Sequence, residues 1–271
     1  MQIHISNASC STKSSRSTDQ VIIDRARVGF IVRSKFRKAT RGRFLGYMWL
    51  VLDPLIISLI YLFVFSVVKS NPNASSILLG VTMYRVFQSS LIGGLRCIRE
   101  LNGGFKAERV STGVVLKAEV LHRLVDVFLQ SILIATILVL AFDVGLLDGI
   151  IFLGLAQIMG FLMFGFGVAL SPYTNRIPDL ENLISYGLRL GFYASPAMYP
   201  MARMEGLHYK VNLYNPFAYF AEFGRFLADV DSTFLSLDTR VFVGFVSGLL
   251  LLSIFGLRRV DHLRWRMTTW S

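Results

Sequence analysis

Six long apolar stretches, separated by polar segments, dominate the pattern of the chain. They cover residues 45–68, 77–95, 120–142, 149–173, 183–201 and 241–257. The first is long enough, as a helix, to cross a hydrocarbon core of about 30 Å, and the fourth contains no charged residue. The pattern therefore predicts an all-α integral membrane protein with six transmembrane helices.

The first 44 residues are polar and basic instead. Residues 6–18 are rich in Ser and Thr, which predicts a flexible tail. Residues 21–38 predict a basic amphipathic helix that lies on the membrane surface, with a solvated cytosolic helix as the alternative. We thus expect three parts: a cytoplasmic tail and interface helix (1–44), a transmembrane domain (45–257) and a cytoplasmic C-terminal tail (258–271).

The composition is both apolar and basic, with 54% hydrophobic residues and a net charge of +11. A basic chain suggests either nucleic acid or a membrane, and the positions of the cations decide between them. If both termini are cytoplasmic, 21 of the 28 Lys and Arg residues lie in cytoplasmic segments. This is the bias that orients membrane helices, so the basic excess indicates topology rather than nucleic-acid binding.

Charged residues inside predicted spans depart from this pattern, and three stand out: Asp53, Arg85 and Arg189. A charge at a helix centre costs roughly 2.5–3.5 kcal/mol on insertion scales. We expect these residues to line a polar path or to pair, as Asp53 with Arg85 or Asp53 with Arg189. Snorkelling to the lipid headgroups is the alternative, and it suits Arg189 better than Arg85.

Aromatic residues crowd the same predicted helices and could stack on sugar rings. An interfacial aromatic belt is the alternative for those near span ends. Together with the three charges, the candidates for a substrate channel are Tyr47, Trp49, Asp53, Tyr61, Tyr84, Arg85, Phe87, Arg189, Tyr193 and Tyr199.

Two connecting segments also carry candidate functions. Residues 96–117 alternate in charge around a single aromatic, which is typical of an element that docks a soluble partner; a solvated connector is the alternative. The candidate docking residues are Glu100, Phe105, Lys106, Glu108 and Arg109. Residues 202–240 would face outward, either as short helices that dip into the outer interface or as an ordinary loop.

The chain lacks the sequence signatures of a catalytic centre. There is no Gly-Lys-Ser/Thr for a nucleotide phosphate, no His-Glu-x-x-His and no Cys-x-x-Cys. Asp229-Val230-Asp231 is only a weak match to a metal site. We expect no catalytic residue, metal or cofactor in this chain. The rival interpretation is a membrane glycosyl- or acyltransferase that uses Asp53, or Asp229 with Asp231, as its acid.

Three blocks of sequence resemble ABC-2-type permeases that export polysaccharides. The first block, RGRFLGYMWLVLDPL, covers residues 41–55 and resembles the family's entry into its first span. The second, GFG at 165–167 followed by NRIPDL at 175–180, is similar to its fourth-span exit. The third, FYASPAMYP at 192–200 followed by YNPF at 214–217, is similar to its fifth span and the segment after it. The first block argues against an ABC-2 drug or lipid exporter.

The resemblance implies a permease subunit with six spans, both termini cytoplasmic, that forms a homodimer. It would pair with two separate ABC subunits, which bind ATP and Mg²⁺, and would move a lipid-linked glycan (capsule, O-antigen or teichoic acid) across the inner membrane. Residues 96–117 then correspond to the family's coupling helix, and residues 202–240 to short outer re-entrant helices.

Overall fold

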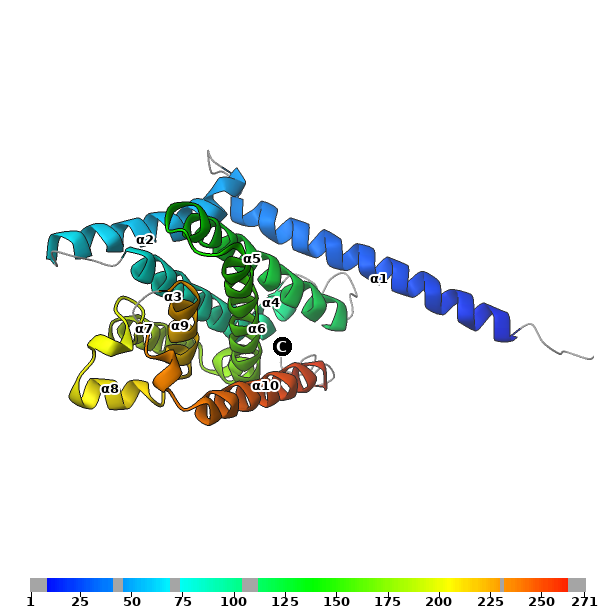
Figure 1. The fold of residues 1–271 in the computed structure, drawn as a ribbon. Coiled ribbons are helices and arrows are strands. Elements are labelled where there is room, and N and C mark those ends of the chain that lie inside the picture. The colour runs from blue at the N-terminus through cyan, green and yellow to red at the C-terminus, as the bar shows by residue number, and fades with distance from the viewer. Residues whose placement is uncertain (1–8, 41–45, 69–73, 104–111, 230–231, 263–271) are drawn as a thin grey trace, which may run out of the picture.

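The computed structural model describes residues 9–40, 46–68, 74–103, 112–229 and 232–262, and within these ranges every regular element is a helix (Figure 1). The long helices are α1 (Ser9–Thr40), α2 (Trp49–Val68), α3 (Ala74–Leu95), α5 (Thr112–Ala141), α6 (Leu146–Arg176), α7 (Pro178–Ala194) and α10 (Thr239–His262). The short ones are η1 (Gly46–Met48), α4 (Cys97–Gly103), η2 (Met201–Arg203), α8 (Gly206–Asn212), α9 (Pro216–Leu227) and η3 (Phe234–Ser236).

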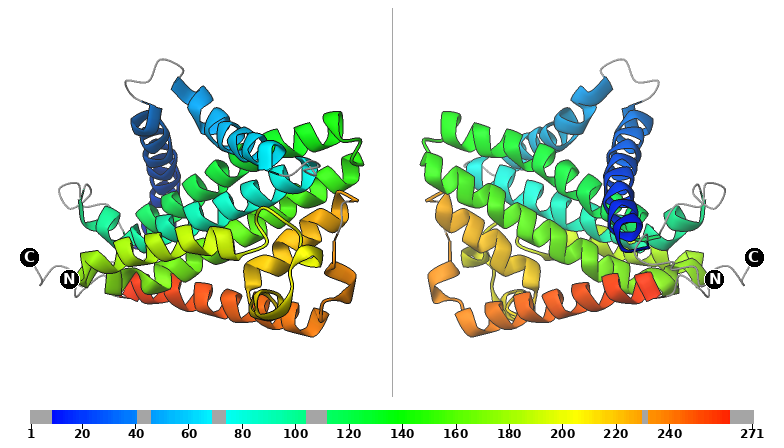
Figure 2. Two further views of the ribbon diagram at one scale, coloured as in Figure 1. Left: turned by 90° about the vertical axis from the view of Figure 1, so that its left-hand side faces the viewer. Right: turned by 90° about the vertical axis from the view of Figure 1, so that its right-hand side faces the viewer.

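Helix α6 lies at the centre, between α3, α5 and α10 (Figure 2). Two of its glycines explain this position, because they let the neighbouring backbones come close. A Cβ added to Gly167 would lie 2.9 Å from the Cα of Gly94 on α3, and one added to Gly165 would lie 2.8 Å from the Cα of Ser253 on α10. The GFG block thus forms the contact of α6 with two helices at once.

Within the described ranges, three helical segments are long and apolar enough to cross a membrane: Gly113–Ala141, Leu146–Arg176 and Thr239–Val260. They correspond to the third, fourth and sixth predicted spans. The other three predicted spans coincide with α2, α3 and α7, and the count of six remains a prediction. The bounds predicted for the fifth span, 183–201, are wrong, because α7 begins at Pro178 and ends at Ala194. Pro196 explains the end, because proline disfavours the α conformation of the residue before it, and Ser195 is extended.

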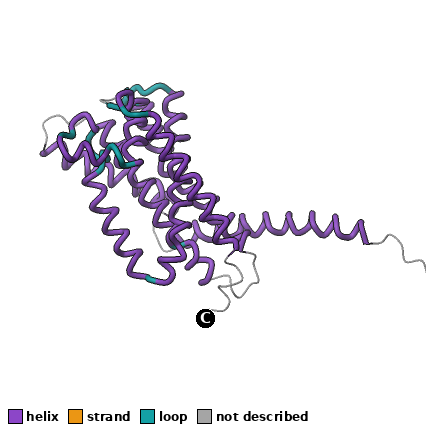
Figure 3. The backbone as a smooth tube through the Cα atoms, turned by 90° about the horizontal axis from the view of Figure 1, so that it is seen from below, coloured by secondary structure: helices purple, strands orange, loops and turns teal. Residues whose placement is uncertain are grey.

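The N-terminal helix α1 is longer than the pattern indicates. It begins at Ser9, so residues 9–18, which the composition assigns to a flexible tail, are helical, and that part of the expectation is wrong. Its N-terminal part projects beyond the other helices (Figure 3). Farther along, Ile31 is buried in a small apolar core with residues of α4 and α5. Helix α1 is therefore anchored at one end of the bundle.

The opposite end carries the short helices of residues 202–240. Helix α9 is defined by its first residues: Pro216 occupies the first turn, and the Asn215 side chain accepts a hydrogen bond from the Phe217 amide at 3.1 Å. Phe217 and Phe220 then pack into the main core. The described part of this segment is thus a set of short helices rather than a plain loop, and their position in the outer interface remains a prediction.

Candidate functional site

A pocket of about 350 Å³ lies between α2, α3 and α7. Four of its lining residues are predicted channel residues: Tyr84 and Arg85 on α3, and Arg189 and Tyr193 on α7. The remaining lining residues are Ile57, Val81, Gln88 and Phe192. Three helices that are distant in sequence therefore bring part of the predicted set to one place.

Within this region the predicted charge pair is Asp53 with Arg85. Asp53 lies in the second turn of α2 and Arg85 in the middle of α3, and their side chains form an ion pair. Of the two pairings considered from the sequence, the structure shows this one. The pair offsets two charges that would each be costly in an apolar surrounding, and it ties α2 to α3.

Arg189 has a different environment from Arg85. Its guanidinium lies 5.4 Å from the centroid of the Tyr186 ring, one turn earlier on α7, an arrangement that favours a cation over an aromatic face. Among the described residues no carboxylate forms an ion pair with Arg189. No carboxylate in the described part of the chain therefore offsets the positive charge at this side of the pocket.

The predicted aromatic residues divide into a buried and an exposed group. Tyr84 is buried, and its hydroxyl donates to the Leu188 carbonyl at 2.5 Å, so it links α3 to α7. Phe87 packs against Tyr84 and Phe217, each with 5.6 Å between ring centroids. Tyr193 is 59% exposed at the pocket. Only Tyr193 thus offers a largely exposed aromatic ring to a ligand here.

The other predicted aromatic residues lie away from the pocket lining or cannot be placed. Trp49 is half-buried at the start of α2. Tyr199 is half-buried beyond α7, where its hydroxyl donates to the Tyr193 carbonyl at 2.7 Å. The side chains of Tyr47 and Tyr61 lie outside the described residues.

The end of the bundle that carries α4 holds two clusters of ion pairs. In the first, Lys35 of α1 pairs with Glu100 of α4 and with Glu119 of α5. Burial opposes the charge on Lys35, but the carboxylates of Glu119 and Glu100 outweigh it, so its pKa is raised. Burial likewise opposes the charge on Glu100, and its hydrogen bond and attraction to Lys35 nevertheless hold its pKa below the ordinary value. Both groups therefore keep their charges near neutral pH.

The second cluster joins α4 to the beginning of α7. Glu181 is buried in the first turn of α7. Its carboxylate accepts a hydrogen bond from Arg96 Nε at 2.6 Å and lies 2.9 Å from Arg99 Nη1. Arg96 stands at the junction between α3 and α4, and Arg99 is on α4. Of the predicted docking residues, Glu100 is placed, whereas Phe105, Lys106, Glu108 and Arg109 lie outside the described residues.

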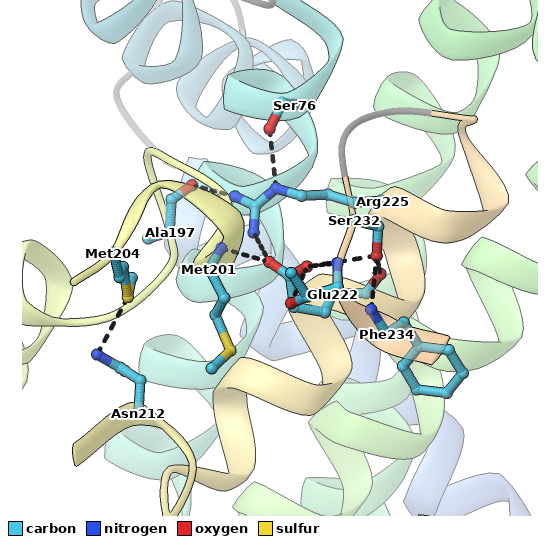
Figure 4. Close-up of polar contacts among 10 residues, drawn as sticks. Ser76, Ala197, Met201, Met204, Asn212, Glu222, Arg225, Ser232 and Phe234 are labelled. Atoms are coloured by element: carbon cyan, nitrogen blue, oxygen red, sulfur yellow. Dashed lines mark hydrogen bonds and ion pairs between the residues drawn. The ribbon is translucent and has the colours of Figure 1, made fainter. Parts of the chain in front are cut away.

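A buried ion pair that the sequence did not reveal lies on α9, at the end of the bundle opposite α4 (Figure 4). Glu222 and Arg225 of α9 have fully buried side chains, 3.0 Å apart. Arg225 also donates to Ser76 Oγ at 2.8 Å and to the Ala197 carbonyl at 3.3 Å. The Glu222 oxygen that faces Arg225, Oε1, also accepts from the Met201 amide at 2.9 Å, and Oε2 accepts from the Thr233 amide at 2.8 Å. The two opposite charges stand three residues apart within an aromatic run, and this spacing could have indicated the pair.

Of the acids proposed for the enzyme interpretation, the structure describes Asp53 and Asp229. Asp53 is engaged by Arg85, and Asp231 lies outside the described residues. Among the residues that are described, no three His, Cys, Asp or Glu side chains come together in a way that could hold a metal ion.

Comparison with known families decides the class of protein. The family model described as ABC-2 type transporter matches residues 27–227. The chain belongs to this family. As an ABC-2 transporter it is a multi-pass membrane protein and the transport subunit of an ABC exporter, and membership implies an ATP-binding partner and a substrate taken from the membrane. The match includes all three helices of the pocket and both ion-pair clusters around α4.

Curated ABC-2 relatives share the chain's sequence at moderate identity. The O-antigen export system permease protein RfbA of Myxococcus xanthus is 26% identical over 184 residues, covering 65% of this chain and 68% of the relative. A protein with the same name from Klebsiella pneumoniae is 27% identical over 193 residues, covering 66% and 70%. A second from Klebsiella pneumoniae is 25% identical over 190 residues, covering 64% and 68%.

Proposed function

We propose that this ABC-2 permease moves a lipid-linked polysaccharide across the inner (cytoplasmic) membrane, driven by ATP hydrolysis in a separate nucleotide-binding subunit. The observation that carries the proposal is the similarity to O-antigen export permeases over about two thirds of the chain. O-antigen is the glycan that their names specify. The functional assembly would be a homodimer with two ATP-binding subunits, which bind the ATP and Mg²⁺.

The pocket supports a glycan substrate. It combines an exposed aromatic ring, Tyr193, with the hydrogen-bonding groups of Gln88 and Arg189. Sugars present both apolar ring faces and hydroxyls, so a site that handles them needs both kinds of group. The substrate path would run along the α2 and α7 surfaces next to this pocket, with Asp53 and Arg85 as its polar part.

The ion pairs around α4 support coupling to a partner. Helix α4 lies in the predicted cytoplasmic segment, and the basic residues there favour a position on the inner side. It is tied to α1 through Lys35 and to α7 through Glu181. A subunit that moves α4 on binding ATP would therefore move α7, which forms a wall of the pocket.

Deletion of the gene tests the function in the cell. We expect a deletion strain to lose its surface glycan and to accumulate finished lipid-linked glycan on the cytoplasmic side, because synthesis continues while export stops. Surface glycan is measured by labelling intact cells, and the internal pool by extraction and gel electrophoresis. Re-expression of the wild-type chain is the control, and a deletion strain with normal surface glycan would refute the proposal.

A further inference from the structure

The pocket between α2, α3 and α7 contains two arginines in unequal positions. Arg85 is paired with Asp53, and together they contribute no net charge. Arg189 lines the same pocket, and no described carboxylate forms an ion pair with it. The pocket therefore carries one positive charge without an acidic partner among the described residues, inside a predicted span, where such a charge is costly.

We propose that this pocket binds a phosphate group of a membrane amphiphile and that Arg189 is the residue that receives it. The inference deepens the proposed function and rests on it for the identity of the amphiphile, which would be the carrier lipid of the exported glycan. A phosphate or diphosphate ester would neutralise the excess charge, and the planar guanidinium can donate two parallel hydrogen bonds to its oxygens.

The neighbouring side chains fit the parts of such a molecule on either side of the phosphate. Tyr193 offers an exposed ring on which a sugar can stack, and Gln88 can both donate and accept hydrogen bonds. Ile57 and Val81 provide an apolar wall for the first carbons of a lipid chain. The volume of about 350 Å³ is near the lower end for ligand pockets, which suits a headgroup rather than a length of polymer.

The Asp53–Arg85 pair has a supporting role in phosphate binding, which follows from the positions of the two residues. Arg85 is three-quarters buried at its side chain, and Asp53 on α2 holds it by an ion pair. Arg85 can therefore act as a fixed donor in the pocket lining, whereas Arg189 is exposed and its guanidinium lies over the Tyr186 ring. We assign anion capture to Arg189 and positioning to the Asp53–Arg85 pair.

Equilibrium binding to the purified full chain in phosphatidylcholine nanodiscs tests the proposal. The probes are a polyprenyl diphosphate, the uncharged polyprenol of the same length, and phosphatidylglycerol, each measured by thermophoresis. We expect wild type to bind the diphosphate at least about tenfold more tightly than the polyprenol, since a charge-assisted pair contributes on that order. Arg189→Gln should remove this difference and leave polyprenol binding unchanged.

Two further variants keep the test specific. Arg189→Lys retains the charge but loses the planar guanidinium that donates two parallel hydrogen bonds. Its affinity for the diphosphate should be intermediate. Arg240→Gln removes an exposed cation at the start of α10, outside the pocket, and should bind like wild type. The thermal midpoint of each ligand-free variant shows whether it is folded. Diphosphate binding that is unchanged in a folded Arg189→Gln variant, or equal binding of diphosphate and polyprenol, would overturn the proposal.

Phosphatidylglycerol distinguishes the two sources of a phosphate. If it binds as tightly as the diphosphate and depends equally on Arg189, the phosphate site stands and its ligand is a membrane lipid. If only the diphosphate binds, the ligand is the carrier of the substrate. Neither result depends on transport, so a failure of the deletion experiment would refute the export function and leave the phosphate site to be judged by binding alone.

Discussion

Arg225 illustrates how one residue can organise a whole end of this protein. Its guanidinium contacts α3 through Ser76, the segment after α7 through Ala197, and α9 through Glu222. A buried charge is tolerated only when it is paired and its donors are satisfied, and each of its three nitrogens has an acceptor. The short helices at this end are thereby fixed to α3.

Removing one partner of this pair is expected to destabilise the fold strongly. Arg225→Met leaves the Glu222 carboxylate buried without its cation, and removal of one partner of a buried pair costs about 3–5 kcal/mol. Reversible unfolding of the purified chain in SDS measures the loss. Glu205→Gln changes an exposed carboxylate nearby and serves as the control. A loss below about 1 kcal/mol in Arg225→Met, the usual range of a surface pair, would show that the pair contributes little.

Single residues also show what could be predicted from sequence and what could not. The pairing of Asp53 with a span arginine follows from the cost of an isolated charge in an apolar helix, so it was foreseen. Arg225 was assigned to an outer loop because its burial results from segments that are distant in sequence, and no local pattern reports that. Tyr84 was a channel candidate, but its ring is mostly packed in the core.

At the scale of elements, α4 and α7 form the most informative pair. Arg96 and Arg99 hold the buried carboxylate of Glu181 at the start of α7, and two to three turns later α7 presents Arg189 and Tyr193 to the pocket. Helix α7 is thus connected at its two ends to the predicted coupling region and to the candidate substrate site. A rigid helix with these contacts can transmit a displacement between them.

Glu181→Gln is expected to reduce the transport obtained per ATP hydrolysed. The change removes the charge that holds Arg96 and Arg99, so α4 can move without α7, and residues along such connections change coupling by roughly 0.5–2 kcal/mol, or about two- to thirtyfold. ATPase rate and glycan export are measured on the complex with its ATP-binding subunit.

Asp179→Asn is the matched control, because Asp179 is an exposed acid in the same first turn of α7. Equal ratios of transport to hydrolysis in wild type and Glu181→Gln would show that this contact does not transmit the coupling. Glu181→Gln could instead prevent the complex from assembling. In that case the charge-reversed triple variant Glu181→Arg, Arg96→Glu, Arg99→Glu should assemble again, if the contact acts as we describe.

The elements themselves were largely predictable, because apolar runs long enough to cross a membrane leave few alternatives to a helix. Their ends were less so. Residues 9–18 of the expected flexible tail are part of α1, and the fifth predicted span ends at Ala194 rather than at residue 201. Polar residues can continue a helix when it is anchored farther along, as α1 is by Ile31, and composition alone does not reveal such an anchor.

At the scale of the molecule, the arrangement of helices turns separate candidates into a site. The close contacts of Gly167 with α3 and of Gly165 with α10 place α6 in the centre, and α2, α3 and α7 then meet at the pocket. The sequence indicated which residues carry polar or aromatic chemistry, but not which of them meet, since that depends on how the helices pack. Arg85, Arg189 and Tyr193 meet at the pocket, and Asp53 pairs with Arg85. Trp49 and Tyr199 do not line the pocket.

Transport by the purified complex tests the central claim most directly. The chain and its ATP-binding subunit would be reconstituted into vesicles that carry a lipid-linked glycan on the side facing the ATPase, and a membrane-impermeant glycosidase enclosed inside would report arrival on the other side. We predict that digestion of the glycan requires ATP, both subunits and intact vesicles. Digestion that proceeds equally without this chain or without ATP would contradict the account.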